Sequence, residues 1–139
     1  MKRLMLCASL ALVLAASTRF VGAQQPGTTP RFTGKSEVMD GKDLSAARRS
    51  FEAGARTAWH SHDNGQLLMV EKGRMRAQKR GQAVKDYGVG DSDYTGPNVE
   101  HWHGAAANEA LVQINIGFGG GSKWFADVTD AEYLSQGRR

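Results

Sequence analysis

The sequence predicts an all-β fold in which short strands form one sandwich or barrel, followed by one short C-terminal helix. Three observations support this class. Short runs from residue 49 onward are bounded by glycines. Residues 110–116 alternate apolar and polar side chains over several positions, which is the period of a half-buried strand. No helical period interrupts these runs, and many short strands at this spacing are typical of sandwiches and barrels.

The N-terminus has the pattern of a secretory signal peptide over residues 1–23. Two basic residues precede an apolar run over residues 4–16, and small residues end the segment at Ala23. The apolar run is shorter than the span of about 20 residues that a membrane helix needs. We therefore expect cleavage near Ala23, export to the periplasm or medium, and no membrane association afterwards.

The basic excess of the chain is concentrated in this segment. The chain has 18 lysines and arginines against 14 acidic residues, and Lys2, Arg3 and Arg19 lie in the predicted signal. The mature domain is therefore close to neutral, and we expect no nucleic-acid binding. The single cysteine, Cys7, also lies in the signal, so we expect neither a disulfide nor thiol chemistry in the mature domain.

After the signal, the sequence predicts an N-terminal arm or linker over 24–44, a barrel over 45–128, and a helix and tail over 129–139. The segment 34–47 is weakly patterned and could contribute an edge strand. Within the barrel, the expected strands are 66–70, 74–78, 91–95 and 110–116. The helix is expected over 131–136 with Thr129 or Asp130 as its cap. Trp124 and Phe125 are expected to pack on the outside of the barrel.

All four histidines lie in two short clusters, His60-Ser61-His62 and His101-Trp102-His103. Residues at i and i+2 of a strand share a face, so each pair presents two imidazoles to one side. Trp59 and Trp102 alternate to the other face and are expected to pack there. A lone histidine is usually a surface or core residue, but these two pairs account for every histidine in the chain. The pattern therefore favours a metal site, because imidazole binds zinc, copper, iron, nickel and manganese.

The residues around the two histidine pairs resemble the two sequence motifs of the cupins. The first motif is matched by Gly54, His60, His62, Gln66 and Gly73, and the second by Gly90-Asp91 and Gly96-Pro97-Asn98-Val99-Glu100-His101. Most cupins carry glutamate at the position of Gln66, proline at that of Gly96 and glycine at that of Asn98. Asparagine tolerates the left-handed turn that glycine serves. The resemblance implies a single cupin barrel, which is a double-stranded β-helix or jelly roll, with one bound metal.

A longer resemblance is to the small manganese cupins with (R)-selective hydroxynitrile lyase activity. It rests on four strings: 51–62, 65–66, 101–106 and 128–130. It implies one divalent metal, with manganese first and iron, nickel or zinc as alternatives. It also implies His60, His62, Gln66 and His101 as ligands, and His103 as a second-shell or catalytic histidine.

Two glutamines and one histidine decide which chemistry the sequence predicts for the site. Gln66 replaces a carboxylate by a neutral oxygen, so the metal keeps its positive charge and favours an anionic ligand. His103 can transfer a proton because its ordinary pKa is near neutrality. The lyase group usually has a further histidine at the position of Gln113, and glutamine can hydrogen-bond a substrate but cannot act as a base.

Three functions follow from these residues and stay open at the level of the sequence. The first is a metal-dependent lyase of cyanohydrins. The second is a metal-dependent oxygenase that uses the same ligands. The third is a non-catalytic exported cupin that binds a small molecule. In each case we expect a small-molecule partner and a homodimer or higher homo-oligomer, because small single-barrel cupins commonly pair through their sheet edges.

Overall fold

The computed structural model describes residues 33–135. The predicted signal peptide and the end of the predicted tail lie outside these residues. The chain divides into two units, Met1–Val38 and Met39–Arg139. Residues 33–38 of the first unit carry neither helix nor strand, and every element below belongs to the second unit.

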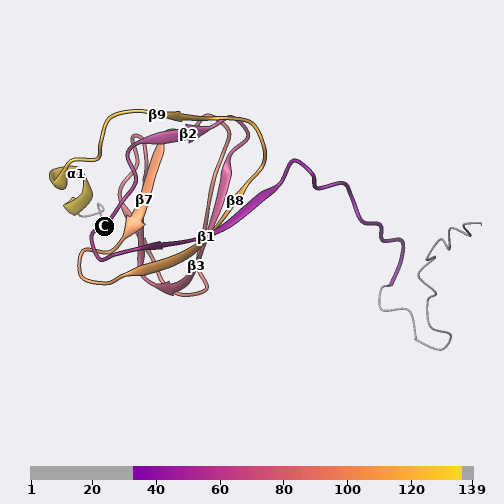
Figure 1. Ribbon diagram of the computed structural model, residues 1–139, viewed down its shortest axis with the longest axis horizontal. Helices are drawn as coiled ribbons and strands as arrows, with labels where there is room; N and C mark the ends of the chain where they lie inside the picture. The colour runs from indigo at the N-terminus through magenta and orange to yellow at the C-terminus, as the bar shows by residue number, and fades with distance from the viewer. Residues whose placement is uncertain (1–32, 136–139) are drawn as a thin grey trace, which may run out of the picture. The chain divides into compact units, whose positions relative to one another are not determined.

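The described part of the second unit is built from antiparallel strands in two sheets (Figure 1), which confirms the all-β class. One sheet has the order β1-β8-β3-β6 and the other the order β5-β4-β7-β2-β9. From β5 onward successive strands alternate between the two sheets, so the sheets form the two walls of one barrel. The strands are β1 (Ser45–Phe51), β2 (His60–His62), β3 (Gln66–Gly73), β4 (Met75–Lys79), β5 (Lys85–Tyr87), β6 (Ser92–Thr95), β7 (His101–Ala105), β8 (Leu111–Gly117) and β9 (Ser122–Trp124).

The four strands that the sequence predicts are present as β3, β4, β6 and β8, with ends shifted by one to three residues. The edge strand expected near 34–47 is β1, which begins at Ser45 and extends to Phe51. It lies at one edge of its sheet and pairs with β8. No strand of residues 33–135 pairs with its other edge, and β1 is exposed along most of its length.

One hydrophobic cluster fills the space between the sheets. It consists of Leu68, Val70, Met75, Ala105 and Leu111, with Phe51 and Tyr87 packed against it. Leu68 and Val70 alternate with exposed or half-buried residues along β3, and they share the face that carries Gln66. Burial of each large apolar side chain stabilises the fold by about 1.5–3 kcal/mol. The same face of β3 therefore supplies both core residues and a predicted metal ligand.

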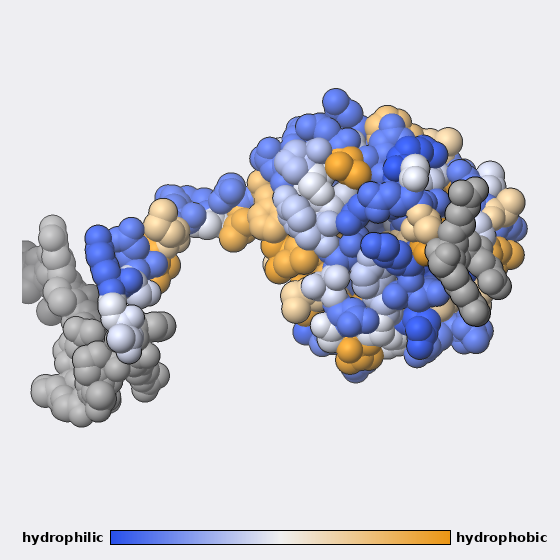
Figure 2. Space-filling model, turned by 180° about the vertical axis from the view of Figure 1, so that it is seen from behind, coloured by the Kyte–Doolittle hydropathy of each residue, from blue (hydrophilic) through white to orange (hydrophobic). Residues whose placement is uncertain are grey.

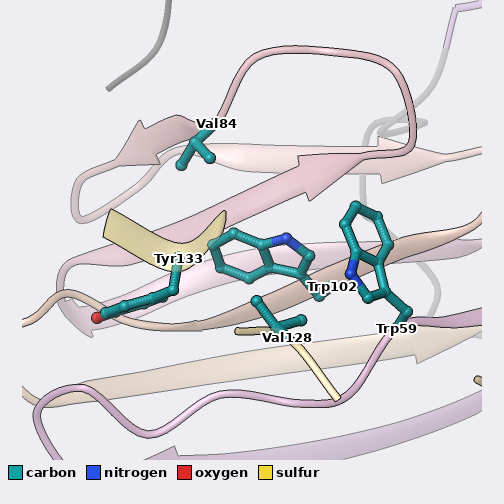
Figure 3. Packing of buried hydrophobic residues seen from close by; sticks show 5 residues of the cluster. All are labelled: Trp59, Val84, Trp102, Val128 and Tyr133. Carbon is teal, nitrogen blue, oxygen red and sulfur yellow. The ribbon is translucent and has the colours of Figure 1, made fainter. Parts of the chain in front are cut away.

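A second cluster joins the helix to the other side of β7. Trp59, Val84, Trp102, Val128 and Tyr133 pack together there, with Trp102 close to Tyr133 and Trp59 (Figure 3). The helix α1 (Asp130–Leu134) begins after Thr129, which forms a capping box with Glu132. The predicted helix and its cap are confirmed, although the helix ends before residue 136. Trp59 and Trp102 pack as the alternation of the strands predicts.

The surface of the barrel is mostly polar on the side shown in Figure 2, where apolar residues lie mainly towards the edges of the view. In the described part of the chain, no helix has the length and apolar character that a membrane span requires.

Candidate metal centre

Two neighbouring strands bring three histidines together inside the barrel. His60 on β2 pairs directly with His101 on β7, and His103 follows two residues later on the same face of β7. The ring centroid of His60 lies 4.2 Å from that of His101 and 5.3 Å from that of His103. One nitrogen from each of the three rings lies within 4.8 Å of the others, and all three side chains are buried. This group of described residues could hold a metal ion. Its three members are all histidines, so it contains no carboxylate.

Backbone carbonyls fix the orientation of two of these rings. Nδ1 of His60 donates to the carbonyl of Ala58 at 2.9 Å, and Nδ1 of His101 donates to the carbonyl of Val99 at 3.0 Å. A carbonyl can only accept, so in each neutral ring Nδ1 carries the hydrogen and Nε2 keeps a lone pair. This is the usual arrangement of a histidine that binds a metal through Nε2.

Asn98 shapes the turn that presents the Val99 carbonyl. Its φ is 59°, and among the described residues it is the one non-glycine residue with a positive φ. Its backbone N–H donates to the carbonyl of His62 at 2.8 Å, which ties the turn to β2. The left-handed turn that the sequence predicts at Asn98 is therefore confirmed.

His62 and Gln66 lie beside the three-histidine group. Nδ1 of His62 lies 2.8 Å from the hydroxyl of Ser122, while its Nε2 is buried without a hydrogen-bond partner among the described residues. Oε1 of Gln66 lies 3.2 Å from Nε2 of His101. Since both of these atoms are acceptors when His101 is neutral, a cation near them would relieve their repulsion. The orphaned Nε2 and the facing acceptors fit a bound metal.

The four imidazoles are held neutral by their surroundings. Burial, followed by the neighbouring His101, lowers the pKa of His60 to about 4. Burial is also the largest cause that lowers the pKa values of His62 and His101. Burial, and then the other three histidines, hold the pKa of His103 well below its ordinary value. In His60, His62 and His101 the neutral ring keeps on Nε2 the lone pair that a metal needs.

Gln113 on β8 sets the tautomer of His103. Its side-chain amide donates to Nδ1 of His103 at 3.1 Å and to Oδ1 of Asn115 at 2.6 Å. Gln113 is fully buried, and its own Oε1 has no hydrogen-bond partner among the described residues. Because Nδ1 of His103 accepts a hydrogen bond, the neutral ring carries its proton on Nε2. Gln113 and His103 therefore act as one hydrogen-bonded unit.

A cavity of about 250 Å³ adjoins His62 and Gln66. Its other lining residues come from β1, from β8, from Gly65 before β3, and from the glycine-rich segment and the first residue of β9, and they include Ala47, Asn115 and Ser122. Most of these side chains are small. The cavity is therefore large enough for a small molecule and lies directly beside two of the predicted ligands.

The expected position of Trp124 is wrong. Trp124 pairs with His60 across β9 and β2, so its side chain lies on the same face of the sheet as the imidazole. The two rings stack with centroids 4.8 Å apart, although Trp124 is 63% exposed. It therefore lies exposed at the rim of the histidine site, on the face of the sheet that it shares with His60. The local sequence did not reveal this, because the glycine-rich segment before β9 hides the register.

The structure brings the six predicted site residues into one region. His60 and His101 belong to the three-histidine group, and His103 joins them there. His62 lies outside the group, but its ring centroid is 5.1 Å from that of His60. Gln66 and Gln113 contact His101 and His103 respectively. Which of these side chains bind the metal, and which take part in catalysis, stays a prediction.

Residues 47–117 match the cupin domain family. The chain is 38% identical over 124 residues to the (R)-mandelonitrile lyase of Granulicella tundricola, an alignment that covers 81% of this chain and 95% of that protein. Its structure is similar to that of a cupin-like protein from Thermotoga maritima, with a TM-score of 0.64 and 42% identity over 66% of this chain and 71% of that one. A DMSP lyase of Ruegeria pomeroyi shares the fold, with a TM-score of 0.53 and 14% identity over 67% of this chain and 46% of that one.

Proposed function

We propose that this chain, which belongs to the cupin family, is a metal-dependent lyase that cleaves or forms the carbon–carbon bond of small cyanohydrins. The observation that carries the proposal is the buried group of histidines, whose described members are neutral potential metal ligands and include no carboxylate. The relative from Granulicella tundricola, named an (R)-mandelonitrile lyase, supports the choice of reaction.

The residues that would hold the metal are His60, His62, Gln66 and His101, and manganese is the metal we propose. Held by uncharged donors alone, a divalent metal keeps its full positive charge and supplies a Lewis acid for an oxygen that becomes negatively charged. The cavity beside His62 and Gln66 provides room for the substrate on that side.

The low pKa of His103 disfavours the proton transfer that the sequence predicts for it, and His103 supports the step instead through the proton on its Nε2. Cleavage of a cyanohydrin breaks the O–H bond and the carbon–carbon bond and forms the carbonyl group; the hydroxyl proton passes to water and the electron pair of the carbon–carbon bond leaves with cyanide. A neutral imidazole can donate a hydrogen bond to that developing negative charge without a charge of its own, and the low pKa of His103 keeps it neutral. Gln113 acts through His103 as a positioning residue, because it holds Nδ1 as an acceptor and so keeps the proton on Nε2.

The test joins metal analysis to a cleavage assay on protein purified without chelators. We expect wild type to contain about one divalent metal per chain and to release benzaldehyde and cyanide from mandelonitrile. His60→Ala should lose the metal, whereas His103→Gln should keep the metal and lose most of the activity. Arg48→Gln is the control, because Arg48 pairs with Glu71 away from the site.

Two outcomes would contradict the proposal. Metal-loaded wild type that consumes oxygen in the presence of substrate, but releases no cyanide, would favour the oxygenase. Metal-loaded wild type that turns over no substrate in either assay would favour the non-catalytic binder.

A further inference from the structure

Strand β1 carries an arginine towards the histidine site. Arg49 pairs with Gln113 in the register of β1 and β8, and residues directly opposite each other in an antiparallel pair project from the same face. Gln113 is fully buried and contacts His103. The side chain of Arg49 therefore leaves the sheet on the face that carries the site.

The two neighbours of Arg49 on this face locate it more closely. Ala47 lines the cavity together with His62 and Gln66. Phe51 has its ring 5.9 Å from that of His103, in an edge-on arrangement. Arg49 lies two residues from each, so it stands between the cavity and His103. Its positive charge also adds to the effect of burial and of the other histidines in lowering the pKa of His103.

Arg49 has no counter-ion in the described part of the chain, whereas the adjacent Arg48 has one. The guanidinium of Arg48 lies 2.5 Å from the carboxylate of Glu71, and Arg48 alternates to the opposite face of the strand. Arg49 forms no ion pair with any residue from 33 to 135. It is exposed at the sheet edge, so a ligand can reach it.

A free guanidinium beside a site of neutral donors creates an excess of positive charge. The planar fork of arginine fits a carboxylate through two parallel N–H···O hydrogen bonds. A bound metal would add to this charge, since none of its predicted ligands is an anion. The site therefore favours a small organic anion over a neutral molecule of the same shape.

We infer that Arg49 is a specificity-determining residue that binds the carboxylate of the substrate while the reacting group lies beside His62, Gln66 and His103. The substrate class is then a small hydroxynitrile or aldehyde that carries a carboxylate. The identity of the reacting group rests on the proposed function, whereas carboxylate binding by Arg49 rests on the register, the cavity and the missing counter-ion alone.

The test compares benzoate with its neutral analogue benzamide as probes for the full chain freed of metal, with binding measured by ligand-observed NMR. We expect wild type to bind benzoate more tightly than benzamide. Arg49→Gln should lower the affinity for benzoate about tenfold relative to benzamide, as expected for the loss of a charge-assisted hydrogen bond. Arg48→Gln, which removes the same charge from the other face, should leave this ratio as in wild type.

Arg49→Lys adds a second variant, because it keeps the charge and loses the planar fork. It should retain part of the preference for benzoate, and circular dichroism should show that each variant is folded. Added salt should weaken benzoate binding by wild type, since the arginine is exposed. A benzoate affinity that is equal in wild type and Arg49→Gln, or no benzoate binding by wild type, would overturn the inference.

A second arm uses metal-loaded protein and compares kcat/KM for mandelonitrile and its 4-carboxy derivative. Wild type should have the higher kcat/KM for the 4-carboxy derivative, and Arg49→Gln should lower the ratio of this kcat/KM to that for mandelonitrile about tenfold. An unchanged ratio would overturn the inference. If no cyanohydrin is cleaved but benzoate binding depends on Arg49, the proposed lyase function fails and carboxylate binding by Arg49 stands.

Discussion

The buried imidazole of His60 should make the stability of the metal-free protein depend strongly on pH. Its pKa is about 4 in the folded protein, against 6.5 for a free histidine. As the pH falls below 6.5 the unfolded chain gains a proton at this ring and the folded chain does not, so acid favours unfolding. The gap corresponds to about 3 kcal/mol of stability lost between pH 7 and pH 4. The metal-free protein is therefore expected to unfold at markedly lower urea concentration at pH 4.

Urea unfolding of wild type and His60→Gln at both pH values, with a chelator present, measures this loss. The variant lacks the titrating ring but keeps the carboxylates, whose contribution to the pH dependence cancels in the comparison. The free energy of unfolding should fall by about 3 kcal/mol less in the variant than in wild type between pH 7 and pH 4. If both proteins lose the same amount, burial of the His60 imidazole does not control its protonation and the reasoning is refuted.

Three further predictions concern stability and assembly. Gly104→Ala should lower the free energy of unfolding by at least about 2 kcal/mol, because the added Cβ would lie 2.4 Å from the carbonyl oxygen of Ala55. Thermal unfolding tests this, with Gly88→Ala as the control, because a Cβ at Gly88 meets only ordinary contacts. Thr129→Ala should lower the free energy of unfolding by about 1 kcal/mol, because it removes the N-cap of α1. An unchanged denaturation midpoint would contradict this prediction. Exposed edge strands present unpaired backbone groups, so we expect light scattering to show a dimer, and a monomer at high concentration would exclude one.

Much of the site follows from local patterns in the chain. The period of two along β7 places His101 and His103 on one face and Trp102 on the other, which the burial of Trp102 in the outer cluster bears out. The left-handed turn at Asn98 also follows from residue type, because few residues other than glycine and asparagine adopt a positive φ.

The partners of Gln113 do not follow from such patterns. Its place on a strand is predictable, but its hydrogen bonds to His103 and Asn115 depend on how β7 and β8 face each other across the barrel. The sequence therefore suggested contact with substrate, whereas the structure shows that both amide hydrogens are already used within the protein.

The sequence alone determined the all-β class, the two histidine pairs and the neutral Gln66, because alternation along a strand and residue chemistry are local properties. Only the tertiary structure decided which strands lie side by side. That register places Trp124 over His60 and Arg49 opposite Gln113. Pairing between distant strands is fixed by the burial of the whole interior, and no single segment carries that information.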